Sequence, residues 1–503
     1  MAVSRRALRT GATGLMLTAG LVLTCAPAGA ENTPADLPDQ LAEKVTADGL
    51  QRHLIALQRI ADRNDGNRAA GTSGYDASLD YMAGKLTAAG FEVSTPTFDA
   101  ATHEVTSESL AVSGKDIEVR TMTFAATTDE DGVRGPLAVV PESDATGCTA
   151  ADYGSADYTD TIALIRRGGC DFAVKQRAAA DAGAIGALIS NNEPGILNGT
   201  LGGPENAVIP TGGISQADGD ALADQSGAEV TFVTVSTTSE FTERNLIAQT
   251  RTGRADNVVT AGAHLDGVFD GPGINDNGSG SVALLETALK LGGSPDVPNA
   301  VRFAWWGAEE FGLQGSTKYV QSLSFEQQLD IAMYLNFDMV GSPNAGYFVY
   351  DGSGEEFGEP GPVGSDDIQN AFTRYFDSTG IATEPTEFDG RSDYLEFVNS
   401  GIPSGGLFTG GDGTKTEEQA AKWGGQAGEN FDPCYHQKCD NLRNIDRTAL
   451  ERNAKAIAYV TASYGLSTEG VNGVPSREQR AQLRADTPKM ATATAGSGSE
   501  QVR

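Results

Sequence analysis

The sequence predicts an α/β fold in which a mixed, mostly parallel sheet carries helices on both faces. From about residue 244 onward, short apolar segments alternate with longer segments of helical periodicity, a pattern typical of such sheets. Strands are expected at 257–261, 301–306, 332–337 and 404–408, and helices at 281–291, 314–323 and 448–464. Ligand sites in these folds form beyond the carboxyl ends of the strands, so the residues that follow each strand are the first candidates for chemistry.

An earlier stretch of the chain is expected to belong to the same sheet domain. Apolar residues recur at helical spacing over 73–89, Gly90 would end that helix, and a strand is expected to begin at 91–93. Residues 31–45 are rich in Pro, Asp and Ala and are expected to form a loose leader. The main domain would therefore be discontinuous, formed by 31–117 and 241–467.

Residues 118–240 have a different pattern of apolar and polar residues and are expected to form a small inserted domain of mixed strands and helices. Short buried strands are expected at 161–165 and 185–189, with a helix over 172–182 between them. A run of Val, Thr and Phe over 230–235 predicts a half-exposed strand.

The overall composition fits a soluble chain with more than one domain. A length of 503 residues exceeds the usual size of one hydrophobic core. Asp and Glu total 68 against 36 Lys and Arg, and the net charge of −32 disfavours nucleic acid and anionic membranes as partners. Residues 468–503 are rich in small and charged residues without periodicity, which predicts a disordered C-terminal tail.

Residues 1–30 have the pattern of a signal peptide that is removed on export. Arg5 and Arg6 begin a basic segment, an apolar run follows over 15–25, and Ala28-Gly29-Ala30 offers a cleavage site. The paired arginines leave both the general and the twin-arginine export routes open. The apolar run is too short for a stable membrane anchor, so we expect a secreted, extracellular protein.

The five cysteines are best explained by two disulfides. Cys25 would leave with the signal peptide, and an even set remains: Cys148, Cys170, Cys434 and Cys439. Four cysteines allow three connectivities; the pairs 148–170 and 434–439 are preferred because they are local. A thiolate zinc site is disfavoured because no C-x-x-C spacing occurs.

Most of the candidate catalytic side chains follow predicted strands. The chain has four histidines. His264 follows the strand expected at 257–261 and lies near Asp266, and His436 lies between Cys434 and Cys439. The candidate residues are His264, Asp266, Asp276, Glu309, Glu310, Asp338 and His436. The two imidazoles and three of these carboxylates would form a ligand set that suits zinc. Because this exceeds what one catalytic zinc usually takes, two ions ~3.5–4 Å apart that share a bridging carboxylate are expected.

The doublet Glu309-Glu310 could supply both a ligand and a proton acceptor. Adjacent residues that leave a strand point in different directions. One carboxylate could therefore bind metal while the other faces a water held by the metals and acts as general base. The alternative is a solvated acidic turn, and an isolated pair of glutamates is more often surface than catalytic.

Taken together, these motifs resemble the secreted bacterial zinc aminopeptidases of clan MH, of the leucyl aminopeptidase type. The resemblance rests on His264-x-Asp266, Asp276-Asn277-Gly-Ser-Gly, Glu309-Glu310, Asp338 and Tyr435-His436, in that order. It extends to Asn67–Thr72, Gly390-Arg391-Ser392-Asp393 and Gly405–Gly410, and it covers about 55–100 and 244–465. It implies the zinc exopeptidase fold and removal of N-terminal, Leu-like residues from peptides and proteins.

The resemblance also implies how two Zn²⁺ ions would be held. His264 and Asp338 would bind one ion, Glu310 and His436 would bind the other, and Asp276 would bridge both. Some relatives also carry calcium, for which this sequence gives no support.

Further roles are implied for the residues around the ions. Glu309 would be the general base that activates the bridging water, and Asp266 would orient His264 through its other ring nitrogen. Tyr435 would hydrogen-bond the oxyanion. Arg391 would position the substrate near its free terminus, and Phe408 would line the side-chain pocket.

Residues 118–240 resemble a protease-associated domain. The resemblance rests on Ala163–Arg167, Gly169–Phe172 and Lys175–Ala184. Domains of this kind are inserted at the same position in relatives, where they are thought to shape substrate access and carry no chemistry. The segment from 118 to 240 contains no histidine, so it offers no obvious second metal centre.

Two alternatives to an aminopeptidase remain open at the level of sequence. A carboxypeptidase or dipeptidase of the same clan would use Arg391 to hold a terminal carboxylate. A receptor-like binding protein would have lost ligands, whereas this chain keeps all five and Glu309. A monomer is expected in each case.

Other potential sites are weaker. His53 and His103 are expected to be packing, surface or loop residues, and Trp305 and Trp306 are expected in the core. The glycines over 271–280 are not followed by the Lys-Ser/Thr of a phosphate-binding loop. No Gly-x-Ser-x-Gly occurs, which disfavours a serine hydrolase of that type.

Overall fold

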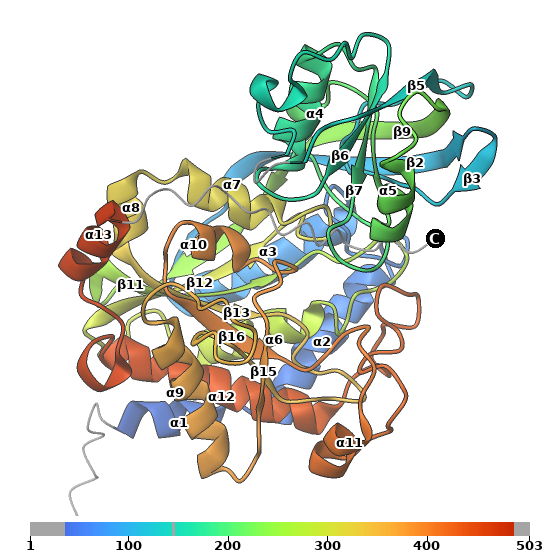
Figure 1. Cartoon of the computed structure of the whole chain (residues 1–503). Helices are drawn as coiled ribbons and strands as arrows, with labels where there is room; N and C mark the ends of the chain where they lie inside the picture. Colours follow the sequence, from blue (N-terminus) through green and yellow to red (C-terminus); the bar gives the residue numbers. More distant parts are fainter. Residues whose placement is uncertain (1–35, 143–145, 487–503) are drawn as a thin grey trace, which may run out of the picture. The chain divides into compact units, whose positions relative to one another are not determined.

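The computed structural model describes residues 36–142 and 146–486, and these form two mixed eight-stranded sheets with flanking helices (Figure 1). The first sheet has the strand order β1-β10-β12-β11-β13-β16-β14-β15. Its strands are β1 Glu92–Ser94, β10 Leu246–Gln249, β11 Arg254–His264, β12 Asn299–Trp306, β13 Ile331–Phe337, β14 Phe348–Tyr350, β15 Glu384–Thr386 and β16 Ser404–Phe408.

The centre of the first sheet is parallel, as the sequence predicts. β12, β11, β13 and β16 run in the same direction, and they are the four strands expected from the apolar segments after residue 244. β10 and β14 pair antiparallel with the two ends of this parallel core. The carboxyl ends of the four central strands therefore meet at one edge of the sheet.

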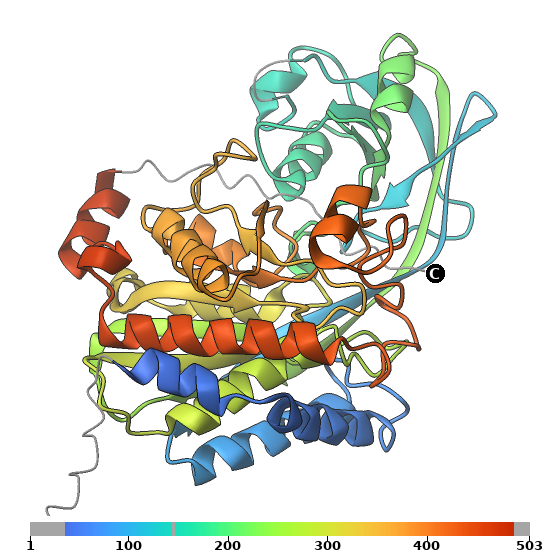
Figure 2. The same cartoon turned by 90° about the horizontal axis from the view of Figure 1, so that it is seen from below.

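Helices cover both faces of this sheet. Side chains along β12 alternate between two cores, with Phe303 and Trp305 in one and Ala304 and Trp306 in the other. The first core is covered by α1 Leu37–Lys44, α2 Ala47–Ala61, α3 Ser73–Ala88, α6 Gly278–Leu291, α9 Ser365–Ser378 and α12 Arg447–Leu466. Figure 2 shows α12 beside α1. The other face packs against α7 Gln314–Ser322, α8 Phe325–Asp330 and α10 Leu395–Asn399.

The second sheet is inserted between β1 and β10. It has the order β3-β2-β9-β5-β6-β7-β8-β4. Its strands are β2 Thr97–Val112, β3 Lys115–Ile117, β4 Arg120–Thr121, β5 Val133–Val139, β6 Ile162–Arg166, β7 Gly186–Ser190, β8 Thr211–Ile214 and β9 Glu229–Arg244, with helices α4 Phe172–Asp181 and α5 Gln216–Leu222. The strands and helix expected within 118–240 are present, and β9 extends the strand predicted at 230–235 to 16 residues.

Two long antiparallel strands join the insertion to the first sheet. β2 pairs with β9 from Thr97 opposite Arg244 to Val112 opposite Val230. Near the start of β2, the Gln314 side chain accepts the Ala101 N–H at 2.9 Å and donates to the Ala101 carbonyl at 2.7 Å. The insertion is thus bonded to the start of α7, four residues beyond Glu310.

Both predicted disulfides are present in the structure. Cys148 pairs with Cys170 inside the insertion, and Cys434 pairs with Cys439 in a short loop before α12. The local connectivity chosen from sequence is therefore confirmed.

Two segments that the sequence predicts to be irregular contain helices. α1 lies in the expected leader, where Pro38 stands in the first turn and Leu41 and Ala42 are buried. Proline favours the first turn of a helix because its missing N–H has no intrahelical partner there. Its abundance therefore misled the prediction.

The second such segment lies in the expected tail. Helix α13, Arg477–Asp486, falls within the predicted disordered stretch. Arg480 is only 3% exposed and donates to the Leu329 carbonyl at 2.8 Å and to Asn257 Oδ1 at 3.2 Å. A helix that docks through an arginine lacks the apolar stripe on which the sequence prediction relied.

The signal peptide expected over 1–30 and the tail beyond residue 486 lie outside the described residues. No helix within 36–142 and 146–486 is long and apolar enough to cross a membrane.

Glu243, near the end of β9, is a buried carboxyl group that fastens the insertion to the first domain. It is 3% exposed and accepts the N–H groups of Gly71 at 2.7 Å and Arg244 at 2.8 Å. Burial is the main cause that raises the pKa of Glu243 to about 7, against these hydrogen bonds.

We expect Glu243 to make folding stability depend on pH. The folded-state pKa exceeds the ordinary value, so the contribution of Glu243 is fully present below about pH 4.5 and is lost as pH rises to about 7. Relative to Glu243→Gln, the wild-type free energy of unfolding should fall by ~1–3 kcal/mol between pH 4.5 and pH 8. Urea unfolding at both pH values measures this difference. Glu240→Gln, at an exposed position of the same strand, is the control; parallel pH curves for Glu243→Gln and wild type would contradict the assignment.

Candidate metal centre

The residues of the sequence motifs meet at the edge where the central strands end. His264 is the last residue of β11, Asp338 directly follows β13, and Glu310 follows β12 after a short turn. Asp276 lies just before α6, and His436 lies in the loop closed by the Cys434–Cys439 disulfide. His264, Asp276, Glu310 and Asp338 are buried, and the side chain of His436 is 6% exposed.

Asp276 presents one oxygen to each of the two histidines. Its Oδ1 lies 3.2 Å from His264 Nε2, and its Oδ2 lies 3.2 Å from His436 Nε2. His264 Nε2 is also 3.1 Å from Asp338 Oδ1, and His436 Nε2 is 3.0 Å from Glu310 Oε2. Two donors that bind one tetrahedral zinc at ~2.0–2.1 Å lie about 3.3 Å apart. The observed spacings therefore fit two cations that share Asp276.

The hydrogen bond available to Nδ1 of His264 and a buried Glu310 oxygen without a hydrogen-bond donor also fit bound cations. His264 Nδ1 lies 3.2 Å from the Asp266 carbonyl and can donate a proton to it, which leaves the Nε2 lone pair facing the carboxylates. Glu310 Oε1 is buried and has no hydrogen-bond partner among the described residues. A buried carboxylate oxygen without a donor fits a cation that completes its coordination.

Asp266 lies beside Nδ1 of His264, the ring nitrogen that faces away from the candidate ligands. Its main-chain carbonyl, rather than its carboxylate, is within hydrogen-bond reach of His264 Nδ1, since the nearer carboxylate oxygen is 3.7 Å away. The carboxylate accepts the N–H of Glu309 at 3.3 Å and the N–H of Glu310 at 3.4 Å. Asp266 thus holds the histidine with its backbone and the glutamate doublet with its side chain.

A chain of hydrogen bonds orients Asp338 from behind. Ser392 donates to Asp338 Oδ2 at 2.6 Å and accepts from Asn336 Nδ2 at 2.8 Å. Tyr334 donates to Asn336 Oδ1 at 3.0 Å and accepts from Trp306 Nε1 at 2.8 Å. The tryptophan is buried, as predicted, and it also anchors this polar chain, whose signal in the sequence was the polar Asn336 in an apolar strand.

Buried acidic residues are concentrated at the site and around it. The buried acidic residues in this region are Asp266, Asp276, Glu309, Glu310, Asp338, Asp393, Asp432 and Asp440. Arg68 is a fully buried guanidinium near them, and it donates to the carbonyls of Leu265, Pro272 and Gly273. One arginine cannot balance this many carboxylates, so additional positive charge is required if they are ionised.

The electrostatics of the site favour proton uptake when no cation is bound. Burial, together with neighbouring carboxylates, raises the pKa of Glu310 to about 7. Burial alone would lower the pKa of His436, but Glu310 and Asp276 raise it to about 11. The two histidines hold the pKa of Asp276 below its ordinary value against the effect of burial. Protons and metal ions therefore compete for the same donors.

A cavity of about 280 Å³ is lined by four of the five candidate ligands, Asp276, Glu310, Asp338 and His436. One wall is apolar and consists of Met339, Phe348, Phe408 and Phe431. The polar residues of the lining include Glu309, Asp338, Glu387, Asp389, Arg391, Asp412 and Tyr435. The predicted Phe408 therefore lies in the pocket wall with three side chains that the sequence did not single out.

Tyr435 and Arg391 lie together at this cavity. The Tyr435 ring stacks on the His436 ring with centroids 3.8 Å apart. Arg391 Nη2 lies 3.4 Å from the Tyr435 hydroxyl, and Nη1 lies 3.4 Å from Asp412 Oδ1. The guanidinium is thus placed to share its charge between the tyrosine oxygen and an acidic partner.

The other two histidines are packing residues outside the cluster. His53 Nδ1 is 2.7 Å from the Tyr81 hydroxyl, and His53 Nε2 is 3.2 Å from Glu286 Oε2. His103 is buried in β2 beside Phe124 rather than in the loop that the sequence suggested.

Comparisons with known proteins agree with this geometry. The profile described as peptidase family M28 matches residues 245–461, and the PA domain profile matches residues 133–222. The chain is 47% identical over 460 residues to the "Probable lipoprotein aminopeptidase LpqL" of Mycobacterium tuberculosis, covering 90% of this chain and 91% of that protein. It is 44% identical over 470 residues to an "Aminopeptidase" of Pseudomonas aeruginosa, covering 90% and 87%.

Solved structures give the same result. An aminopeptidase from Aneurinibacillus sp. strain AM-1 has a TM-score of 0.64 at 27% identity, covering 85% of this chain and 95% of that chain. BSAP, a zinc aminopeptidase from Bacillus subtilis, has a TM-score of 0.53 at 26% identity, covering 86% and 98%.

We expect metal removal to destabilise the protein more at pH 8 than at pH 5.5. Without metal, Glu310 and Asp393 have raised pKa values of about 7. Their contributions are fully present below their ordinary pKa values of 4.5 and 3.8 and are lost as pH rises to about 7. The raised pKa of His436 acts in the same direction, since its contribution declines above about pH 6.5 and is lost as pH rises to about 11. Chelation should lower Tm by on the order of 10 °C at pH 8 and by clearly less at pH 5.5. Thermal unfolding with chelator, and after zinc is restored, measures both shifts; equal shifts would contradict the competition between protons and metal.

Proposed function

Because the chain belongs to peptidase family M28 and is an aminopeptidase, we propose that it is an exported two-zinc enzyme that removes apolar N-terminal residues from peptides. The observation that carries the two-zinc proposal is the orientation of Asp276. Each of its carboxylate oxygens faces a different histidine, and each histidine faces a second carboxylate.

In this proposal, His264 and Asp338 bind one zinc, Glu310 and His436 bind the other, and Asp276 binds both. The concentration of buried carboxylates around a single buried guanidinium supports two dications in place of one. When bound, the zinc pair supplies Lewis-acid polarisation of the scissile carbonyl and lowers the pKa of a water.

Glu309 is the proposed general base. It lines the cavity, and its Oε2 lies 3.9 Å from His264 Nε2, beyond the donor spacings of the proposed ligands. The Asp266 carboxylate accepts the N–H groups of both Glu309 and Glu310, which fixes the backbone of the doublet. Glu309 would take a proton from the attacking water and deliver it to the leaving amine.

Tyr435 is the proposed donor to the oxyanion. Its hydroxyl faces the guanidinium of Arg391, and its ring is held against His436. A phenol fixed by a ligand on one side and a cation on the other can stabilise developing negative charge without rearranging.

The charges of the cavity favour a substrate with a free amino terminus. Glu387, Asp389 and Asp412 line the cavity and would attract an ammonium group and repel a carboxylate. Asp412 already lies beside Arg391, which leaves that arginine less suited to clamp a C-terminal carboxylate. Met339, Phe348, Phe408 and Phe431 would receive a Leu-like side chain.

Export and domain boundaries remain proposals from the sequence. Two disulfides fit an oxidising compartment. We propose cleavage before Glu31, a monomeric enzyme, a catalytic domain of 31–117 and 241–467, and a protease-associated domain of 118–240. Because one relative is named a lipoprotein, lipid attachment at Cys25 is the alternative to cleavage before Glu31. The mass of the mature N-terminus distinguishes these two alternatives.

Glu309→Gln should abolish most turnover while two zinc ions per chain are retained. Glutamine keeps the shape of the side chain but cannot accept a proton, so kcat should fall by ~10²–10⁴-fold. Metal analysis and steady-state kinetics measure the two quantities. Unchanged kcat would remove Glu309 from the proposed role. Loss of one zinc would instead make it a ligand, since Glu309 also lies within reach of His264 and Asp338.

The end of the peptide that is recognised can be tested with blocked substrates. Acetylation of the N-terminus should abolish hydrolysis of a Leu-initiated peptide, whereas C-terminal amidation should leave its kcat/KM nearly unchanged. Among aminoacyl anilides, Leu should exceed Gly in kcat/KM by ~10–100-fold, because the apolar wall buries the larger side chain. Inhibition by amidation in place of acetylation would indicate a carboxypeptidase, and a preference for Gly would contradict the assignment of the apolar wall.

A further inference from the structure

We propose that Asp440 is a positioning residue that fixes the bridging ligand Asp276 relative to His436 and thereby sets the zinc affinity of the site formed by Glu310 and His436. This inference rests on the proposed two-zinc function and adds a residue to it. Asp440 is 2% exposed and contacts none of the proposed ligand atoms.

Asp440 binds three consecutive main-chain N–H groups of the segment that carries Asp276. Its carbonyl accepts the Ile274 N–H at 3.2 Å. Its carboxylate accepts the Asn275 N–H at 2.8 Å through Oδ1 and the Asp276 N–H at 3.0 Å through Oδ2. A single residue therefore binds three consecutive N–H groups of the segment that carries the proposed bridging ligand.

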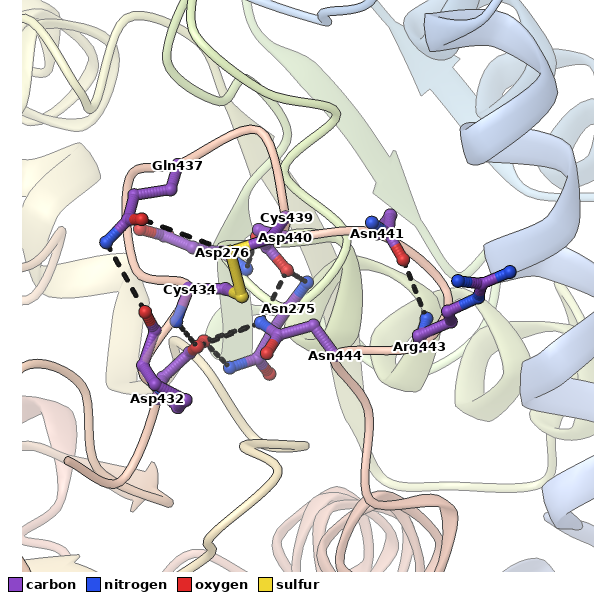
Figure 3. The surroundings of a disulfide bond; sticks show 11 residues. Asn275, Asp276, Asp432, Cys434, Gln437, Cys439, Asp440, Asn441, Arg443 and Asn444 are labelled. Atoms are coloured by element: carbon purple, nitrogen blue, oxygen red, sulfur yellow. Dashed lines mark hydrogen bonds between the residues drawn. A yellow bond between two sulfur atoms is a disulfide. The ribbon is translucent and has the colours of Figure 1, made fainter. Parts of the chain in front are cut away.

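Asp440 also ends the loop that carries the ligand His436. It directly follows Cys439, whose disulfide with Cys434 closes that loop (Figure 3). The Asp440 N–H donates to the Gln437 carbonyl at 2.9 Å. His436 and Asp276 come from segments far apart in the chain. Asp440 belongs to the segment of His436 and is hydrogen-bonded to the segment of Asp276, so it joins the two.

A second acidic residue holds the opposite end of the same loop. Asp432 accepts the Cys434 N–H at 2.8 Å and the Asn275 side-chain amide at 2.7 Å. Asn444 donates from Nδ2 to Asp432 Oδ1 and to Asp440 Oδ1, both at 2.9 Å (Figure 3). The two aspartates thus bracket the disulfide loop, and Asn444 joins them.

The hydrogen-bond inventory explains why a carboxylate is needed at position 440. Oδ1 accepts from the Asn275 N–H and from Asn444, and Oδ2 accepts from the Asp276 N–H. An asparagine has one acceptor oxygen, so its amide would place a donor against one of these donors. Changes to residues that orient metal ligands typically cost ~10–100-fold in metal affinity or activity.

The test compares wild type, Asp440→Asn and the matched control Asp351→Asn. Asp351 is also 2% exposed and also accepts main-chain N–H groups, from Gly354 at 3.1 Å and from Glu356 at 3.0 Å, but these belong to its own loop. Both substitutions remove an acceptor from a buried backbone site. Only Asp440→Asn should alter the metal centre.

The readouts are zinc retained per chain in a series of chelator concentrations, and kcat and KM. In Asp440→Asn, one of the two zinc ions should be lost at a free zinc concentration ~10–100-fold higher than in wild type. At limiting zinc, kcat should fall with occupancy while KM changes by less than ~3-fold, and excess zinc should restore occupancy. Asp351→Asn should retain wild-type zinc binding and kcat even where its Tm falls.

Each outcome decides the inference. Zinc retention and kcat in Asp440→Asn equal to those of the control would overturn it, as would equal zinc loss in both variants. If Asp440→Asn does not fold, Asn444→Ala removes the amide that orients the carboxylate and should weaken the same zinc by a smaller factor; wild-type retention in that variant would then overturn it. Fewer than two zinc ions in wild type would instead contradict the proposed function itself.

Discussion

The arrangement of this protein depends on keeping many carboxylates out of water within one small volume. An isolated buried carboxylate is strongly disfavoured unless it meets a proton, a donor or a cation. Here the carboxylates of Asp276, Glu310 and Asp338 meet imidazoles, those of Asp266 and Asp440 meet main-chain N–H groups, and one fully buried arginine lies among them. Cations at the donors that remain would neutralise the charge that the protein itself leaves unbalanced, which is why metal binding and folding are expected to be linked.

The parallel sheet brings these groups to one edge, but the turns after the strands aim them. Ala308, Met339 and His436 have φ values of 56°, 53° and 56°, in the left-handed region that residues other than glycine seldom adopt. Each lies beside or at a proposed ligand or base. The backbone conformation of these turns therefore contributes to the site as directly as the side chains do. It is held by buried hydrogen bonds such as those that the N–H groups of Glu309 and Glu310 donate to the Asp266 carboxylate.

The sheet and the ligand residues could be predicted from the sequence because both leave local signals. Runs of apolar residues buried on both faces mark parallel strands, and a histidine or carboxylate just after such a run is unusual enough to be noticed. Asp440, Asp432 and Asn444 leave no such signal, since single polar residues in a loop are normally solvated and only tertiary structure buries them. The same limit applies to Arg480, whose docking turns a polar segment into an ordered helix, and to the main-chain carbonyl of Asp266, which lies within hydrogen-bond reach of His264 Nδ1.

The two hydrogen bonds between the Gln314 side chain and the Ala101 main chain have a consequence for protein engineering. The glutamine lies four residues beyond the glutamate doublet. Its side-chain oxygen accepts the Ala101 N–H of β2, and its Nε2 donates to the carbonyls of Ala101 and Phe311. Nearby, the ring of Phe311 meets that of Phe241 on β9. An enzyme shortened by deletion of the insertion would leave the buried Gln314 side-chain oxygen without its Ala101 donor and an aromatic ring uncovered next to its own active centre. Chimaeras that exchange this domain between relatives should therefore be joined beyond the first rungs of the long hairpin, so that the host keeps both contacts.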